Sequence, residues 1–103
     1  MTRFRVPLPE AEEFRAGLEE AHALLARQRG YLGGSIGRNV DDPELWVLQT
    51  RWEGPGAYRR GLGAYDVKAN AWALLGRALD EPSAYEIVDP GQPLNVAEAR
   101  ETP

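Results

Sequence analysis

The residues whose types could do chemistry gather at one corner of the sequence, where Trp52 and Tyr58 lie on either side of Pro55. An indole N–H and a phenol hydroxyl can both donate hydrogen bonds to an anion that develops inside a water-excluding pocket. Buried tryptophan and tyrosine also need polar partners in an ordinary core. The corner therefore predicts either the edge of a pocket or plain core packing, and the residues alone leave both interpretations open.

Other side chains are candidates for the wall of such a pocket. Tyr65 offers a second hydroxyl, Arg38 offers a fixed positive fork, and Trp72 offers a flat surface for an aromatic molecule. Arg38 has an alternative role, because it could form an ion pair with Glu44 or Glu53 across a hairpin.

A general base is harder to find in this sequence. His22 is the single histidine and titrates in the useful range, but its place on a helix predicts a partly exposed residue. Asp66 is better explained as a helix cap than as a base. A substrate acidic enough to ionise by itself would need no base.

Composition narrows the function classes. The chain has 103 residues, enough for one domain, and a net charge of −4, which argues against a nucleic-acid partner. It has no cysteine, which excludes disulfides, thiolate metal sites and cysteine nucleophiles, and we expect no metal and no cofactor. No segment has the pattern of a membrane span or a signal peptide, so we expect no membrane partner and a cytoplasmic protein.

The order of expected elements predicts an α+β, ferredoxin-like βαββαβ fold, with a four-stranded antiparallel sheet and helices on one face. This domain should span residues 1–89, followed by an extended or partly disordered tail over 90–103. The expected elements, in chain order, are a strand at 2–6, a helix at 9–28, strands at 31–40 and 44–52, an interrupted helical region at 55–79 and a last strand at 83–88.

The strand at 44–52 carries apolar residues on both faces, with Leu45 and Val47 on one and Trp46 and Leu48 on the other. Such a strand is covered on both sides. One layer of helices covers only one face of a small sheet, so a second copy of the chain is expected on the other. The pattern predicts a homodimer with two sheets packed face to face.

Three motifs in order resemble the antibiotic biosynthesis monooxygenase (ABM) superfamily of dimeric α+β barrels, from about residue 4 to residue 88. They are "RGYLGGSIGRNVDDPELWVLQTRW", "RWEGPGAYRRGL" and "EPSAY". The resemblance implies a cofactor-independent monooxygenase that oxidises a small or polycyclic aromatic compound, phenol-like or anthrone-like, with O2. It implies Trp52 and Tyr58 as catalytic residues.

The sequence differs from each of two branches of this superfamily. The haem-degrading branch uses a histidine in the second helical region and an asparagine on the first strand, and neither is present here. The chain is more similar to the quinone-forming branch, although Leu48 stands where that branch carries an asparagine four residues before its tryptophan. The resemblance thus implies that Leu48 lies in the substrate pocket without the polar group of that asparagine, and Arg38, Tyr65 and Trp72 are the other expected substrate-binding residues.

Cofactor-free oxygen chemistry has its own requirements. O2 is a triplet and reacts slowly with ordinary organic molecules, so the substrate must supply the electron as a phenolate or enolate. The protein must supply a dry apolar pocket and donors for the anion. Because one fold hosts many functions, two alternatives stay open: a non-catalytic barrel that binds a small apolar ligand, and a structural dimerisation module.

Overall fold

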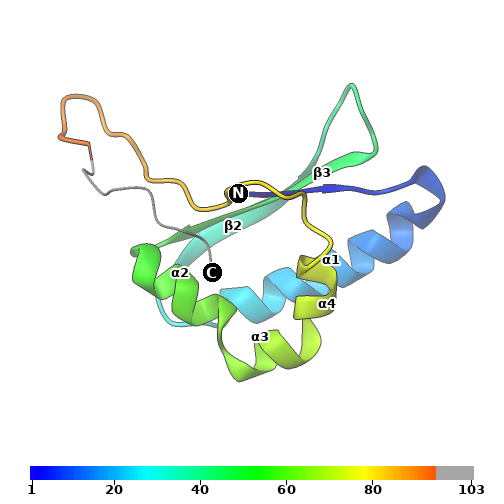
Figure 1. Cartoon of the computed structure of the whole chain (residues 1–103), viewed down its shortest axis with the longest axis horizontal. Helices are drawn as coiled ribbons and strands as arrows, with labels where there is room; N and C mark the ends of the chain where they lie inside the picture. The colour runs from blue at the N-terminus through cyan, green and yellow to red at the C-terminus, as the bar shows by residue number, and fades with distance from the viewer. Residues whose placement is uncertain (95–103) are drawn as a thin grey trace.

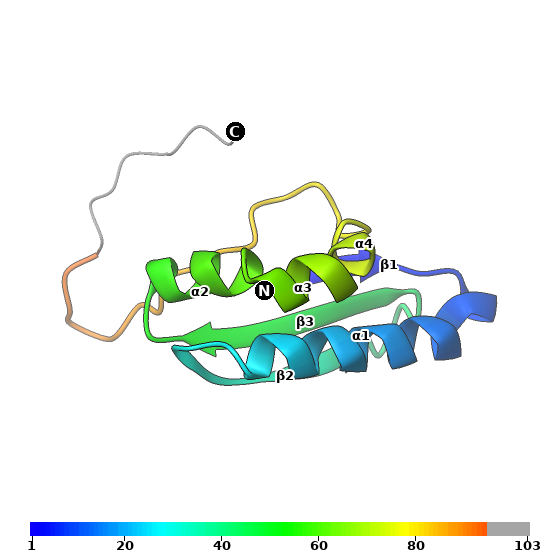
Figure 2. The ribbon, with the colours of Figure 1, turned by 90° about the horizontal axis from the view of Figure 1, so that it is seen from below.

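A three-stranded antiparallel sheet, in the order β1–β3–β2, carries all the helices on one face (Figure 1). The computed structural model describes residues 1–94. Figure 2 shows α1 lying beside the α2–α3 region along the sheet. The elements in chain order are β1 (Thr2–Arg5), a 3-10 turn η1 (Leu8–Glu10), α1 (Ala11–Ala26), β2 (Tyr31–Arg38), β3 (Leu45–Trp52), α2 (Pro55–Leu62), α3 (Tyr65–Asn70) and α4 (Trp72–Leu75).

Helix α1 packs one apolar stripe against the sheet. Its buried residues are Phe14, Leu18, Ala21 and Leu25, which recur at the spacing of a single helix face. The first turn of the expected helix at 9–28 is instead part of η1, which begins after Pro7. The helical stripe and the Trp46–Leu48 face of β3 together enclose the core.

The register of the sheet decides which side chains face the helices. Phe4 lies opposite Trp46, and Ile36 lies opposite Leu48, all on the inner face. A β-bulge between Tyr31 and Gly33 shifts the alternation of β2 at its start. Because of this bulge Tyr31 pairs with Trp52 and reaches the inner face.

The expected fourth strand at 83–88 does not form in the structure. The segment after α4 runs antiparallel to β1 for a short distance, with the Leu79 amide donating to the Arg3 carbonyl and the Met1 amino group donating to the Ser83 carbonyl. Ser83 thus lies opposite the first residue, and residues 84–88 extend past β1 with none of the described strands paired to them. Figure 1 shows this segment leaving the sheet.

The second helical region is interrupted as expected, by Gly63 and again at Ala71. The expected cap at Asp66 is wrong, because the residue before α3 is Ala64 and has no side-chain cap. Asp66 lies in the first turn of α3, and its carboxylate accepts hydrogen bonds from Gln28 Nε2 at 3.1 and 3.3 Å. It therefore ties α3 to the end of α1.

No helix within residues 1–94 lies on the outer face of the sheet. Leu45 and Val47 lie on it and are half-buried, beside the more polar Arg3 and Arg51. The second copy expected on this face stays a prediction. Of the expected tail, residues 90–94 are exposed and have no regular structure, and 95–103 lie outside the described residues. Within residues 1–94, no helix is long and apolar enough to cross a membrane.

Candidate functional site

Trp52 and Tyr58 are in contact at the corner between β3 and α2. Pro55 starts α2, where its missing N–H costs no hydrogen bond, and this turns Tyr58 back toward the strand end. The two rings lie 5.9 Å apart between centroids and are tilted by 51°. This is a favourable distance and angle for a pair of aromatic rings.

Both polar tips at this corner have partners within the chain. Trp52 Nε1 donates to Thr50 Oγ1 at 2.8 Å. Tyr58 Oη shares a 3.2 Å hydrogen bond with Ser83 Oγ, in which either oxygen can donate. The Tyr58–Ser83 hydrogen bond is longer, and either oxygen can donate. The Tyr58 hydroxyl could therefore exchange its partner for a ligand more easily than the Trp52 N–H could.

Gly61 allows α2 to approach the indole ring. A Cβ built on Gly61 would lie 2.7 Å from Trp52 Cη2 and 2.9 Å from Cζ3, closer than real Cβ contacts. The absence of a side chain at this position therefore lets the ring pack closely against the helix.

On its other side, Trp52 contacts Tyr31, which the sequence analysis did not select. The ring centroids are 5.4 Å apart and nearly perpendicular. Tyr31 Oη and His22 Nε2 share a 2.6 Å hydrogen bond, so His22 is half-buried and has a partner. We call Tyr31, Trp52 and Tyr58 the aromatic row. Tyr31 could have been found from the sequence, because it begins the first strand of the hairpin and so lies opposite Trp52, which ends the second.

A cavity of about 170 Å³ lies beside Tyr58, between β1, α2, α4 and the segment after α4. This volume is below the roughly 300–1,000 Å³ typical of drug-sized ligand sites. It therefore suits a small ring better than a polycyclic one. Its lining residues are Met1, Thr2, Arg3, Tyr58, Leu62, Leu75, Ala78, Leu79, Glu81 and Ser83.

Arg3 and Glu81 fix the wall of this cavity that carries Ser83. Arg3 Nε and Nη2 donate to the two Glu81 carboxylate oxygens at 2.6 and 2.8 Å. This bidentate hydrogen bonding lowers the pKa of Glu81 below its ordinary value. The pair holds the segment after α4 against β1 and so positions Ser83 near Tyr58.

The other expected pocket residues lie elsewhere. Leu48 is buried in the core about 13 Å along the strand from Trp52. Tyr65 is 87% exposed, and Trp72 is half-exposed with its Nε1 donating to the Leu62 carbonyl. The structure therefore brings together Trp52 and Tyr58 and leaves these three outside the cavity.

Arg38 lies at the opposite end of the sheet, opposite Trp46. Its Nε donates to the Pro43 carbonyl at 2.6 Å. The ion pair expected with Glu44 or Glu53 is not found among the described residues, and Glu44 instead lies 3.8 Å from Arg5. Arg38 therefore borders a different cavity from Tyr58.

Within residues 1–94, no three histidine, aspartate or glutamate side chains come together as a metal site. The functional groups described at this corner are thus aromatic rings, hydroxyls and the Arg3–Glu81 ion pair. Their chemistry would be hydrogen-bond donation to a bound molecule.

The fold and this corner define a class, the ferredoxin-like α+β chains whose third strand ends in a tryptophan that packs on the next helix. Residues 1–69 match the family model described as antibiotic biosynthesis monooxygenase, and the chain belongs to this family. No curated protein sequence matches this chain significantly.

Solved structures agree with the family assignment. SnoaB, a cofactor-independent oxygenase from Streptomyces nogalater, is 26% identical with a TM-score of 0.65, covering 84% of this chain and 91% of that one. Rv0793 from Mycobacterium tuberculosis is 20% identical with a TM-score of 0.68, covering 88% and 94%. A conserved protein from Methanosarcina mazei Go1 is 16% identical with a TM-score of 0.65, covering 79% of each chain. The last two show similarity of fold.

Proposed function

We propose that the protein is a cofactor-independent monooxygenase that oxidises a small, electron-rich aromatic compound with O2. The observation that carries the proposal is the contact of Trp52 with Tyr58 beside a cavity, in a chain similar to an oxygenase that needs no cofactor. The cavity volume favours a single phenol-like ring, and a three-ring anthrone would enter only once the Tyr58–Ser83 contact opens.

The proposed reaction balances without any further reactant. A methylene group flanked by aryl rings loses a proton, and the resulting carbanion transfers one electron to O2. The two radicals combine to a peroxide anion, which takes up the proton lost in the first step and becomes a hydroperoxide. The hydroperoxide loses water to leave a ketone, so that one diaryl methylene and one O2 give one diaryl ketone and one water. The substrate supplies all the electrons, and the protein lowers the barrier by holding the anion in a dry site.

Tyr58 and Trp52 have different roles in this proposal. Tyr58 lines the cavity, and its hydroxyl would leave Ser83 and donate to the substrate oxygen as negative charge develops. Trp52 does not line the cavity, and its indole N–H is used by Thr50. We therefore assign Trp52 as a positioning residue that fixes the Tyr58 ring.

A non-catalytic barrel that binds a small apolar ligand is the second candidate. It is favoured by the internal hydrogen bonds of Trp52 and Tyr58, because groups that already have partners are consistent with packing alone. It is also favoured by the small cavity. Binding without turnover of the same compounds would support this candidate.

The proposed function includes a homodimer. Leu45 and Val47 lie on the sheet face that bears no helix, and the apolar Tyr85 and Ile87 are 71% exposed on the segment that leaves the sheet. Exposed apolar residues that flank an open sheet face mark interaction surfaces. A second copy of the chain would cover both.

The test is oxidation of dithranol, a small anthrone, followed by absorbance with metal chelator present. We expect a rate above buffer for the wild type. Tyr58→Phe removes one donor to the developing anion and should lower kcat about 10²-fold with little change in KM. Tyr65→Phe, which removes a hydroxyl from a residue that is 87% exposed and outside the cavity, is the matched control. Equal rates for wild type and Tyr58→Phe would overturn the assigned role, and binding without a rate would favour the second candidate.

A further inference from the structure

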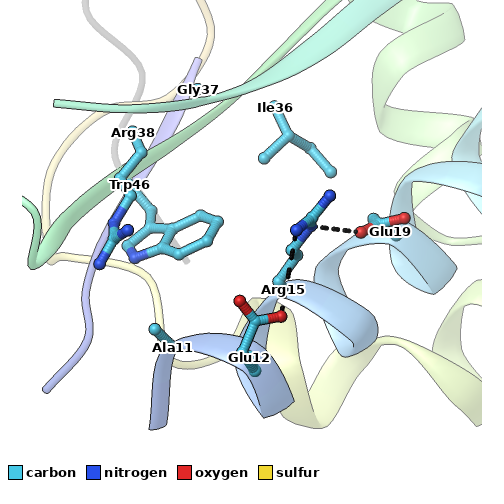
Figure 3. A pocket seen from close by; sticks show the side chains of 8 residues that line it. All are labelled: Ala11, Glu12, Arg15, Glu19, Ile36, Gly37, Arg38 and Trp46. Carbon is cyan, nitrogen blue, oxygen red and sulfur yellow. Dashed lines mark hydrogen bonds and ion pairs between the residues drawn. The ribbon is translucent and has the colours of Figure 1, made fainter. Parts of the chain in front are cut away.

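A second and larger cavity lies at the other end of the sheet, between the first turns of α1 and the end of β2. Its volume is about 390 Å³, within the range of small-molecule sites. Figure 3 shows its lining side chains. They are Ala11, Glu12, Arg15, Glu19, Ile36, Gly37, Arg38 and Trp46. None of them lines the cavity beside Tyr58.

The indole nitrogen of Trp46 has no hydrogen-bond partner. Trp46 is 5% exposed, and its Nε1 is the one buried side-chain nitrogen or oxygen among the described residues without a partner. The two other indoles both donate, Trp52 to Thr50 and Trp72 to Leu62. A buried donor without an acceptor is costly, and each such group in a folded protein calls for an explanation.

Arg38 places a second donor group next to this nitrogen. Its guanidinium carbon lies 5.3 Å from the Trp46 ring centroid, and its Nε is held by the Pro43 carbonyl. No ion pair of Arg38 is found among residues 1–94. Figure 3 shows the guanidinium on the nitrogen side of the indole. Two donors cannot satisfy each other, so an acceptor with negative charge fits between them.

The opposite wall of the cavity carries one arginine and two glutamates, and so a net charge of −1. Arg15 Nε donates to Glu19 at 3.0 Å, and Arg15 Nη1 lies 4.0 Å from Glu12. These two carboxylates would repel a second negative charge on a ligand. Ile36 and the face of Trp46 add apolar surface between the two walls. The cavity therefore combines the Arg38 cation, the Trp46 N–H and a flat apolar surface.

We propose that this cavity binds a small planar aromatic monocarboxylic acid. Its carboxylate accepts hydrogen bonds from Trp46 Nε1 and the terminal nitrogens of Arg38, and its ring lies against Ile36. Trp46 Nε1 is buried in the structure, so binding of the acid requires neighbouring side chains, such as the exposed Arg38, to move. The site is independent of the proposed oxygenase chemistry, because it shares no residue with the cavity beside Tyr58.

The experiment follows the three indole N–H signals by two-dimensional ¹H–¹⁵N NMR during titration with benzoate. The Trp46 signal, assigned with Trp46→Phe, should move downfield and saturate, because its N–H gains an acceptor. The signals of Trp52 and Trp72 already have acceptors and should stay in place. Phthalate, with two negative charges, should bind more weakly than benzoate, and neutral benzyl alcohol should produce no shift.

Arg38→Gln separates the proposed site from adventitious binding. It should weaken benzoate affinity about tenfold or more, because a hydrogen bond to a charged group is lost. Arg51→Gln removes a guanidinium from the outer face and should leave the affinity unchanged. Unchanged Trp52 and Trp72 signals in Arg38→Gln confirm that the variant is folded.

Three results would overturn the proposal. They are no movement of the Trp46 signal in millimolar benzoate, an equal shift with inorganic phosphate or benzyl alcohol, and an affinity indifferent to Arg38→Gln. The dithranol assay tests the cavity beside Tyr58, and the benzoate titration tests the cavity beside Trp46. Failure of one proposal therefore does not affect the other.

Discussion

At the scale of single residues, the site depends on how three aromatic rings share one end of the sheet. Trp52 contacts Tyr31 on one side and Tyr58 on the other, and each hydroxyl of the aromatic row reaches a different polar partner. Trp52 is therefore held from both sides. A change that moves this ring should move Tyr58 with it.

Gly61→Ala tests this dependence. The added Cβ would meet the indole at 2.7 Å, and overpacking costs about 1–3 kcal/mol, against roughly 1 kcal/mol gained by replacing a helical glycine. We expect a net loss of up to about 2 kcal/mol in the free energy of unfolding by urea titration, with slower dithranol oxidation. Gly56→Ala lies in the same helix, and its Cβ would meet only the flexible end of Arg60, so it should not destabilise the protein. If the two variants unfold alike, the close approach of α2 to Trp52 is not required.

At the scale of elements, the segment after α4 matters because it carries Ser83 to Tyr58. Its attachment depends on the Arg3–Glu81 pair and on two backbone hydrogen bonds to the first residues of the chain. Since the folded-state pKa of Glu81 is lowered, this pair stabilises the fold above the unfolded pKa, about 4.3. The contribution is lost as the pH falls through the lower, folded-state pKa.

Acid titration should reveal this attachment. The Tm of the wild type should fall more steeply below about pH 4.3 than the Tm of Glu81→Gln, which has already lost the charged pair. Glu20→Gln on the exposed side of α1 should keep the wild-type slope. Parallel curves for wild type and Glu81→Gln would show that the pair does not stabilise the folded state.

Some secondary-structure elements could be predicted from the sequence and others could not. The helix expected at 9–28 and the strand expected at 44–52 are found as α1 and β3, because the patterns that predict them are local. Tyr31 was missed because a bulge reverses the alternation of β2, and a bulge depends on pairing between strands. The fourth strand was predicted from its composition, but a strand also needs a partner backbone, and β1 does not extend that far.

The candidate site was predictable only in part for a related reason. Trp52 and Tyr58 are close in sequence, and one proline corner brings them together. Arg38 and Leu48 were grouped with them, but they lie along extended strands that separate residues by about 3.3 Å each. Distance along the strand places Arg38 about 20 Å from Trp52, and the sequence does not display this separation directly.

At the scale of the whole molecule, the helices of the described part of the chain leave one face of the sheet uncovered. Leu45 and Val47 are the apolar residues there, flanked by arginines from β1 and β3. A second sheet packed on this face would complete the burial expected of a strand with two apolar faces. The proposed dimer and the proposed site can be tested separately.

Light scattering at micromolar concentration should give about twice the 11.4 kDa mass of one chain. Val47→Asp places a charge in the proposed interface and should shift the protein toward monomer. Val40→Asp makes the same change at a residue that is 95% exposed in the hairpin loop, and it should remain dimeric. A wild-type monomer under these conditions would contradict the proposed dimer.

The most direct test of the central claim is the source of the oxygen atom in the oxidised product. Dithranol is incubated with the chelator-treated protein under ¹⁸O2 in ordinary water, and the product is analysed by mass spectrometry at early times. The proposed chemistry predicts one ¹⁸O in the new carbonyl, formed faster than in buffer and more slowly with Tyr58→Phe. A carbonyl oxygen derived from water, or a rate no greater than in buffer, would contradict the proposal.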